Sequence, residues 1–203
     1  MSGDVTVVPT GTANMASVAA AFRRLGNDLR PAETPEEIRV ADRLVLPGVG
    51  AFSAAMGRID EQEWRGSLVE RVSAGRPTLA ICLGMQLLCE KSEESPGVLG
   101  LGIIPETITR FPGDLLVPQL GWNLVTPDSR CRFLTPGWAY FANSYKLASV
   151  SNGWMSARTG YGGEFVSAME RGDVLACQFH PELSGEWGSD LLARWLAGTR
   201  SGY

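Results

Sequence analysis

Short apolar runs that alternate with helical patterns constrain the fold of this chain more than any other feature. The run 5–8 is followed by the segment 15–25, in which apolar residues recur at helical spacing. The runs 43–46 and 77–81 are also strand-like, and each leads into a turn that contains glycine. This alternation predicts a parallel sheet built from right-handed βαβ units, with functional sites at the carboxyl ends of the strands.

The remainder of the chain predicts further helices and shorter strands. Thr34-Pro35-Glu36-Glu37 has the pattern of a capping box and predicts the start of a short helix. The runs 138–141, 146–150 and 174–179 are β-prone and predict antiparallel additions to the sheet. An apolar stripe at helical spacing in 191–196 predicts a last helix against one face of the sheet. We therefore expect one α/β domain over residues 1–203, since we find neither an internal repeat nor a linker.

Charge and apolar content limit the classes of partner. With a net charge of −4 and no cluster of Lys and Arg, the chain has no basic surface that would bind phosphate backbones. We therefore expect no nucleic acid partner. Residues 1–4 contain no basic segment, and no apolar run approaches the roughly 20 residues of a membrane span. We expect a cytoplasmic protein without a membrane partner.

The cysteines give no sign of a metal site or a disulfide framework. Cys82, Cys89, Cys131 and Cys177 lack paired CxxC spacing, and a single histidine leaves few further ligands for zinc. We expect reduced thiols, no bound metal and no cofactor.

Cys82 is the first candidate for catalysis, because it lies where an apolar strand turns into a helix. Gly84, two residues later, would relieve that turn, as in the nucleophile elbow of hydrolases. A helix N-terminus favours a thiolate, and the N–H of Leu83 could stabilise a developing oxyanion. Taken alone, Cys82 also fits the simpler interpretation of a small buried residue.

His180 is the only histidine, so any imidazole that acts on a thiol must be this one. It follows the run 174–179 and precedes Pro181, which predicts a position at the end of a strand. Glu182 lies two residues further on, and in extended chain it would share a face with His180 and hold the imidazole. The simpler alternative is a structural histidine beside a solvated carboxylate. Together with Cys82, the two residues predict a Cys-His-Glu triad.

Three stretches together resemble the class I glutamine amidotransferases: Leu46-Pro47-Gly48-Val49-Gly50, Ala80-Ile81-Cys82-Leu83-Gly84-Met85-Gln86 and Gln178-Phe179-His180-Pro181-Glu182. Within this class the chain is similar, over nearly its whole length, to the glutaminase subunits of imidazole glycerol phosphate synthases. That further resemblance is carried by Pro47 to Gly50, Ser92-Glu93-Glu94, Gly121-Trp122-Asn123 and Ser144-Tyr145.

The resemblance implies a flavodoxin-like fold and an enzyme that hydrolyses L-glutamine to glutamate and ammonia. The ammonia would pass to a cyclase subunit, a (β/α)₈ barrel in a heterodimer, which makes imidazole glycerol phosphate and an aminoimidazole carboxamide ribotide in histidine biosynthesis. It implies glutamine binding by Gly48, Gln86, Glu94, Ser144 and Tyr145, and an oxyanion site formed by Leu83, Val49 and Gly50. In that family the glutaminase activity is very low until the cyclase subunit binds its nucleotide ligand. Movement of the 47–50 backbone is the proposed switch of this activity.

Some positions depart from the family pattern. Ala80 replaces the usual glycine before the nucleophile, and Pro9-Thr10-Gly11 replaces a common Asp-Tyr-Gly. Gln119 and Asn143 stand where histidines are frequent, and Leu183 stands where a lysine often contacts the cyclase.

Two other functions remain open at this stage. The chain could be a glutaminase of another pathway, because the triad is common to the class, although Gly121-Trp122-Asn123 favours the histidine pathway. It could also be a subunit that keeps the fold only to bind or regulate a partner, against which the complete triad argues.

Overall fold

The computed structural model describes residues 5–11, 15–113, 115–150 and 153–199. Its helices are α1 (Met15–Arg24), α2 (Pro35–Val40), α3 (Phe52–Glu61), α4 (Arg65–Ser73), α5 (Leu83–Leu87), the 3₁₀ helix η1 (Pro181–Leu183) and α6 (Gly185–Gly198). Its strands are β1 (Val5–Val7), β2 (Leu29–Pro31), β3 (Leu44–Leu46), β4 (Thr78–Ile81), β5 (Cys89–Ser92), β6 (Ile104–Arg110), β7 (Gln119–Pro127), β8 (Gly137–Asn143), β9 (Tyr145–Lys146), β10 (Met155–Gly160), β11 (Glu164–Arg171) and β12 (Val174–Cys177).

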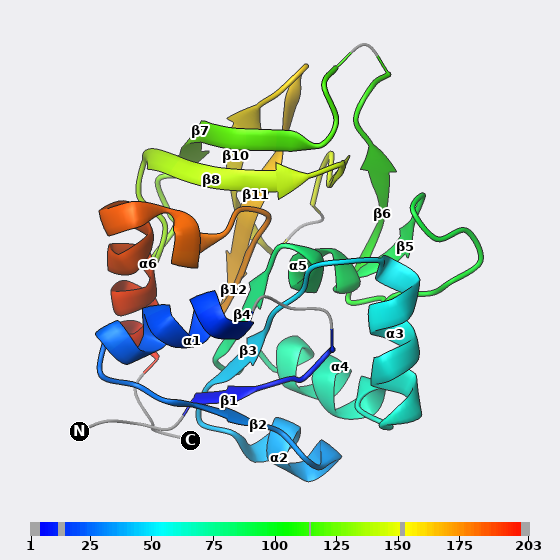
Figure 1. The fold of residues 1–203 in the computed structure, drawn as a ribbon, viewed down its shortest axis with the longest axis vertical. Coiled ribbons are helices and arrows are strands. Elements are labelled where there is room, and N and C mark those ends of the chain that lie inside the picture. Colours follow the sequence, from blue (N-terminus) through cyan, green and yellow to red (C-terminus); the bar gives the residue numbers. More distant parts are fainter. Residues whose placement is uncertain (1–4, 12–14, 114, 151–152, 200–203) are drawn as a thin grey trace.

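A mixed sheet forms the centre of the molecule, in the strand order β2-β1-β3-β4-β12-β11-β10-β7-β8 (Figure 1). Neighbours from β2 to β12 run parallel, and neighbours from β12 to β8 run antiparallel. A smaller sheet has the order β5-β6-β9. The α/β fold predicted from the sequence is confirmed, with antiparallel strands added to one side of a parallel sheet. The run 174–179, predicted as an antiparallel addition, instead gives β12, which pairs parallel with β4 and antiparallel only with β11.

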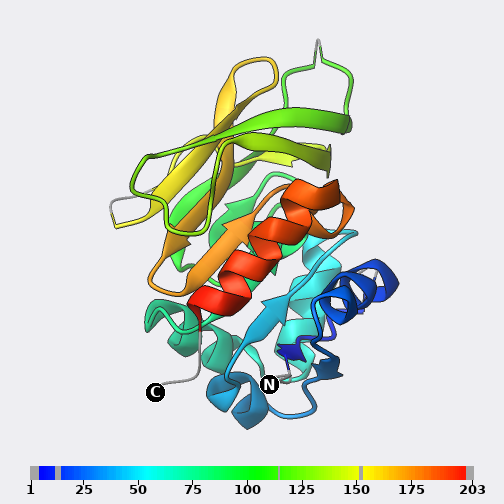
Figure 2. The same ribbon diagram turned by 90° about the vertical axis from the view of Figure 1, so that its left-hand side faces the viewer.

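Alternate residues of the central strands enter two separate cores. Leu79 of β4 packs in the cluster that contains Phe22 of α1 and Trp195 of α6. The next residue, Ala80, belongs to the cluster that contains Leu68 of α4. Because side chains alternate along a strand, these clusters lie on opposite faces of the sheet. Figures 1 and 2 show α1 and α6 together on one of these faces.

The N-terminus of α2 forms as its sequence predicts. Glu37 N–H donates to Thr34 Oγ1 at 3.2 Å, while Thr34 N–H donates to Glu37 Oε2 at 3.4 Å, so both halves of the capping box are present. The reciprocal bonds satisfy N–H groups that the first turn of a helix leaves without partners.

The predicted strand over 146–150 is wrong beyond its first residue. β9 ends at Lys146, and Leu147 makes only an isolated bridge to Val166. The carbonyl oxygen of Ala148 accepts a hydrogen bond from Arg158 Nη1 at 2.8 Å, so this backbone group pairs with a side chain instead of a strand. Residues 151 and 152 lie outside the described part of the chain.

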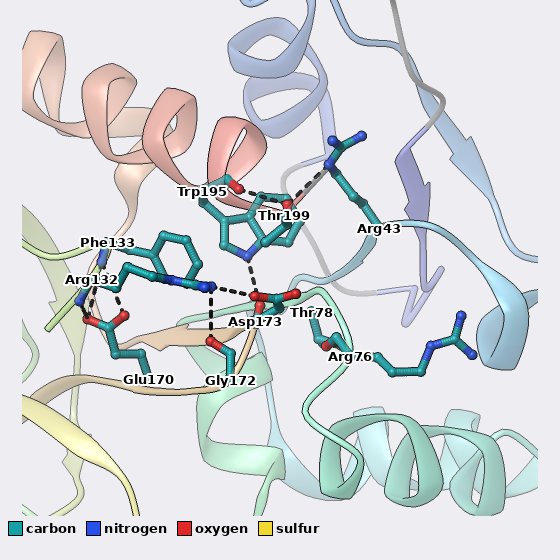
Figure 3. A network of polar contacts seen from close by, with 10 residues as sticks. All are labelled: Arg43, Arg76, Thr78, Arg132, Phe133, Glu170, Gly172, Asp173, Trp195 and Thr199. Carbon is teal, nitrogen blue, oxygen red and sulfur yellow. Dashed lines mark hydrogen bonds and ion pairs between the residues drawn. The ribbon is translucent and has the colours of Figure 1, made fainter. Parts of the chain in front are cut away.

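The C-terminal helix is fastened to the sheet by a polar network (Figure 3). Trp195 Nε1 donates to the carbonyl oxygen of Asp173, whose carboxylate pairs with Arg132. At the end of α6, Thr199 Oγ1 accepts a hydrogen bond of 3.1 Å from Arg43 Nε. These contacts fix α6 against Asp173, which precedes β12, and against Arg43, which precedes β3.

Across the described residues, no helix combines the length and the apolar character required to cross a membrane. Residues 1–4, on which the expected location partly depends, lie outside these residues.

Candidate active site

Cys82 stands at a strained turn between β4 and α5. Its φ of 52° and ψ of −109° place a residue other than glycine in a region that L-residues rarely adopt. Cys82 N–H donates to the carbonyl oxygen of Cys177 at 2.7 Å, which anchors the turn to the end of β12. This arrangement has the strand, sharp turn and helix of a nucleophile elbow.

Gly84 is required by space rather than by its own backbone angles. A Cβ atom there would lie 2.0 Å from the Leu46 carbonyl oxygen, because the first turn of α5 lies against the end of β3. Gly48 is constrained in a similar way, since its Cβ would lie 2.7 Å from Leu83 Cβ. The strained residue is Cys82 itself, whereas the sequence interpretation assigned relief of the turn to Gly84.

His180 follows β12 and is nearly buried, with 5% of its surface exposed. The backbone N–H of His180 donates to the Tyr140 carbonyl oxygen at 2.9 Å, which holds His180 beside β8. Its Nδ1 lies 2.8 Å from Glu182 Oε1. The predicted pair is therefore in contact, but the predicted extended backbone is wrong: the 3₁₀ helix η1 begins at Pro181, and its turn carries the Glu182 carboxylate back to the imidazole.

The surroundings of His180 favour an imidazolium. Burial lowers its pKa, but hydrogen bonds and charges from Cys82 and Glu182 outweigh burial and raise the pKa to about 10. The imidazole therefore interacts both with the Cys82 thiol and with the Glu182 carboxylate. Such an arrangement can stabilise a thiolate and deliver a proton to a leaving group.

A cavity of about 150 Å³ opens beside Cys82. This is smaller than the roughly 300–1,000 Å³ of pockets for drug-sized ligands, and it suits a molecule of amino-acid size. The residues that line it are Val49, Gly50, Cys82, Leu83, Gln86, Glu94, Ala142, Asn143, Ser144 and Tyr145. Eight of the predicted site residues are among them, and Gly48, His180 and Glu182 stand outside the lining in the described structure.

Two of the predicted polar contacts are already occupied by the protein. Leu83 N–H, expected at the oxyanion, donates to the Gly48 carbonyl oxygen at 3.3 Å. Glu94, expected to bind glutamine, accepts a hydrogen bond of 2.8 Å from the N–H of Phe52 at the start of α3. Cys82 thus stands at the cavity, while the N–H expected at the oxyanion is engaged elsewhere.

Gln178 is a polar residue at the site to which sequence reasoning gave no role. Its Nε2 lies 3.6 Å from Cys82 Sγ, and it is fully buried. The available signal was its spacing, because Gln178 stands two residues before His180 and extended residues two apart share a face.

The comparisons with known proteins agree with the fold. The family model described as "Glutamine amidotransferase class-I" matches residues 7–197. A solved glutamine amidotransferase superposes with a TM-score of 0.76 at 20% identity, covering 96% of this chain and 98% of that one. PurLQS from Thermotoga maritima gives 0.75 at 14% identity, covering 98% and 100%. The chain belongs to the class I glutamine amidotransferases.

Curated relatives place the chain in a subgroup of this class. "Imidazole glycerol phosphate synthase subunit HisH" of Methanothermobacter thermautotrophicus is 41% identical over 95% of this chain and 97% of its own length. The Escherichia coli K12 protein of that name is 39% identical over 95% and 98%. "Imidazole glycerol phosphate synthase hisHF, chloroplastic" of Arabidopsis thaliana is 39% identical over 95% of this chain, which spans 34% of that longer protein. Within the class, the chain groups with the HisH subunits.

Proposed function

We propose that this chain is the glutaminase subunit of an imidazole glycerol phosphate synthase, acting in L-histidine biosynthesis. The observation that carries the proposal is His180, which contacts Glu182 at 2.8 Å and interacts with Cys82 at the edge of the cavity. Residues 1–203 would act as one glutamine amidotransferase domain in the cytoplasm.

The reaction follows from the order of the three groups. The Cys82 thiolate attacks the side-chain amide carbon of L-glutamine, and the carbonyl oxygen becomes an oxyanion. His180 gives its proton to the leaving nitrogen, ammonia departs, and a thioester remains on Cys82. Water then attacks the thioester, His180 takes the proton of the water, and glutamate is released. Glu182 keeps the imidazole oriented and stabilises its positive charge.

The lining of the cavity supports the proposed binding roles except that of Gly48, which lies outside the lining. We assign recognition of glutamine to polar groups around the cavity and stabilisation of the oxyanion to backbone N–H groups near Cys82. The first set is Gly48, Gln86, Glu94, Ser144 and Tyr145, and the second is Leu83, Val49 and Gly50.

The hydrogen bond between Leu83 and Gly48 supports a low activity for the free subunit. While the Gly48 carbonyl oxygen holds Leu83 N–H, that donor is lost to the oxyanion. Loss of one such donor costs about 2.7–4 kcal/mol of transition-state stabilisation. We propose that a partner raises activity by rotating the backbone at Gly48, which frees the donor.

An exposed apolar face supports the presence of a partner subunit. Leu120, Trp122 and Leu124 of β7 are exposed, and Leu124 pairs across the strands with the exposed Trp138 of β8. Directly paired residues of an antiparallel ladder project to the same side, so these side chains form one surface. The relatives are named as subunits of a synthase. We assign this surface to the cyclase subunit, a (β/α)₈ barrel, in a heterodimer that receives the ammonia.

The test is glutamate release from L-glutamine by the purified chain, alone and with the matching cyclase subunit and its nucleotide ligand. We expect low activity alone, strong activation in the complex, and loss of this activity in Cys82→Ser, while ammonium-dependent synthesis persists. Normal glutamine-dependent activity of Cys82→Ser would exclude the nucleophile.

Activation by a different synthase would instead assign the chain to another pathway, and growth of a deletion strain without histidine would favour the same conclusion. An intact fold and complex without glutamate release would favour a non-catalytic partner subunit.

A further inference from the structure

A buried pair of glutamines connects the nucleophile to the substrate cavity. Gln178 Nε2 donates to Cys82 Sγ at 3.6 Å, and Gln178 Oε1 accepts a hydrogen bond of 2.9 Å from Gln86 Nε2. Gln86 Nε2 also donates to the Tyr145 carbonyl oxygen at 3.4 Å. Both Gln86 and Tyr145 line the cavity, so a continuous polar path runs from its wall to the sulfur.

Backbone hydrogen bonds set the position of the two ends of this path. Gln178 N–H donates to the Ser167 carbonyl oxygen at 2.9 Å, which continues the ladder between β12 and β11 past Cys177. Cys82 N–H donates to the carbonyl oxygen of Cys177, the residue before Gln178. These backbone bonds therefore fix the position from which the Gln178 side-chain amide contacts the Cys82 sulfur.

The orientation of the Gln178 amide is fixed by its second partner. Gln86 presents an N–H group to Gln178, so the carbonyl end of Gln178 must face Gln86 and its N–H end must face the sulfur. A thiol sulfur is a weak acceptor, whereas a thiolate accepts a charge-assisted hydrogen bond. With an exposed fraction of 0%, Gln178 has no access to bulk water, so the bond to the sulfur matters more than it would at the surface.

We propose that Gln178 is a positioning residue that holds Cys82 as a thiolate and couples it to Gln86 in the substrate cavity. This inference rests on the proposed function, in which Cys82 attacks glutamine. A ligand that draws Gln86 toward the cavity would alter the hydrogen bond between Gln178 Nε2 and Cys82 Sγ. Gln178 thereby adds a second donor to the thiolate besides the imidazolium of His180.

The test measures the rate at which iodoacetamide alkylates Cys82 between pH 5.5 and 9.5. Peptide mass spectrometry separates Cys82 from Cys131, which is partly exposed. In Gln178→Met we expect alkylation about tenfold slower than in the wild type, because the reactive thiolate loses the amide donor. Gln119→Met is the matched control, since both side-chain polar atoms of this buried glutamine lack a hydrogen-bond partner among the described residues.

A second variant separates loss of the amide donor from misfolding. Gln178→Glu keeps the shape and the oxygen that accepts from Gln86 but removes the amide donor, and we expect the same or greater slowing. In the assembled enzyme, kcat should fall about tenfold with a smaller change in KM. If either folded variant alkylates like the wild type at every pH, Gln178 is only a structural residue and the proposal fails. Alkylation needs no glutamine turnover, so this outcome is independent of the proposed glutaminase activity.

Discussion

The backbone N–H of Cys82 donates a hydrogen bond of 2.7 Å to the carbonyl oxygen of Cys177, although 94 residues lie between them in the sequence. This bond extends the parallel pairing of β4 and β12 by one step beyond the last strand residues. It sets the turn that holds the thiol against the chain segment that continues to the imidazole. The geometry of the candidate site is thus determined by the central sheet.

Replacing Glu182 by glutamine should reduce glutamine-dependent activity by up to about 10⁴-fold, because the amide stabilises neither the imidazolium nor one orientation of the ring. Glutamate release by the complex with cyclase measures the effect. Glu186→Gln, an exposed position in the first turn of α6, is the control and should retain activity. Activity of Glu182→Gln within a factor of three of wild type would contradict the assigned role.

The only imidazole of the chain should titrate far above its usual range. Burial opposes protonation, but Cys82 and Glu182 outweigh it and raise the pKa of His180 to about 10. NMR of the single histidine ring measures this directly in a protein without an affinity tag. Cys82→Ser should lower the pKa, since it removes one of the stabilising partners, and an unchanged value near 6.5 in the wild type would contradict the interaction.

The raised pKa also predicts the sign of a stability change. Because the folded-state pKa exceeds the unfolded value of about 6.5, the protonated ring contributes stability in full below pH 6.5. That contribution is lost as the pH rises through about 10. Denaturant unfolding of the wild type and of Glu182→Gln should therefore differ more at pH 6 than at pH 10.5.

Alanine at position 84 should destabilise the protein by at least about 2 kcal/mol, because its Cβ would overlap the Leu46 carbonyl oxygen at 2.0 Å and both backbones would have to separate. Gly57→Ala is the matched control: it lies in α3 with open space around it, and should stabilise by about 0.5–1 kcal/mol. Chemical denaturation compares the two. Equal stability of Gly84→Ala and wild type would show that α5 and β3 can separate without cost.

Trp122→Ala should weaken binding of the cyclase by about 2 kcal/mol, roughly thirtyfold in Kd, if the apolar face is the docking surface. Half of the Trp122 surface is exposed, and its ring contacts Tyr140 edge to face. Calorimetric titration measures the affinity. Val40→Ala, an exposed apolar position on α2, should bind normally, and equal loss in both variants would argue against a specific surface.

Local sequence signals predicted the elements that depend on neighbouring residues. The capping box at Thr34 and the apolar runs of β1, β3 and β4 depend on short-range chemistry, and the structure contains them. The strand expected over 146–150 depends on long-range pairing, and the side chain of Arg158 takes the carbonyl oxygen of Ala148 instead. Helices α3 and α4 were not predicted individually.

The same distinction applies to the site. Motifs pointed to the residues that meet around the cavity, because strand ends in a parallel sheet converge. They did not predict that the Gly48 carbonyl oxygen occupies Leu83 N–H, which depends on how two loops approach. The contact of Gln178 with Cys82 likewise requires the register between β4 and β12.

The backbone angles of Cys82 have an evolutionary consequence. A residue held at φ 52° and ψ −109° costs on the order of 1–3 kcal/mol, and glycine would relieve most of that strain. Mutation therefore tends to remove this thiol in any lineage that no longer depends on it, since its loss improves folding. Persistence of cysteine at this turn across descendants would be a record of continuous selection for the reaction.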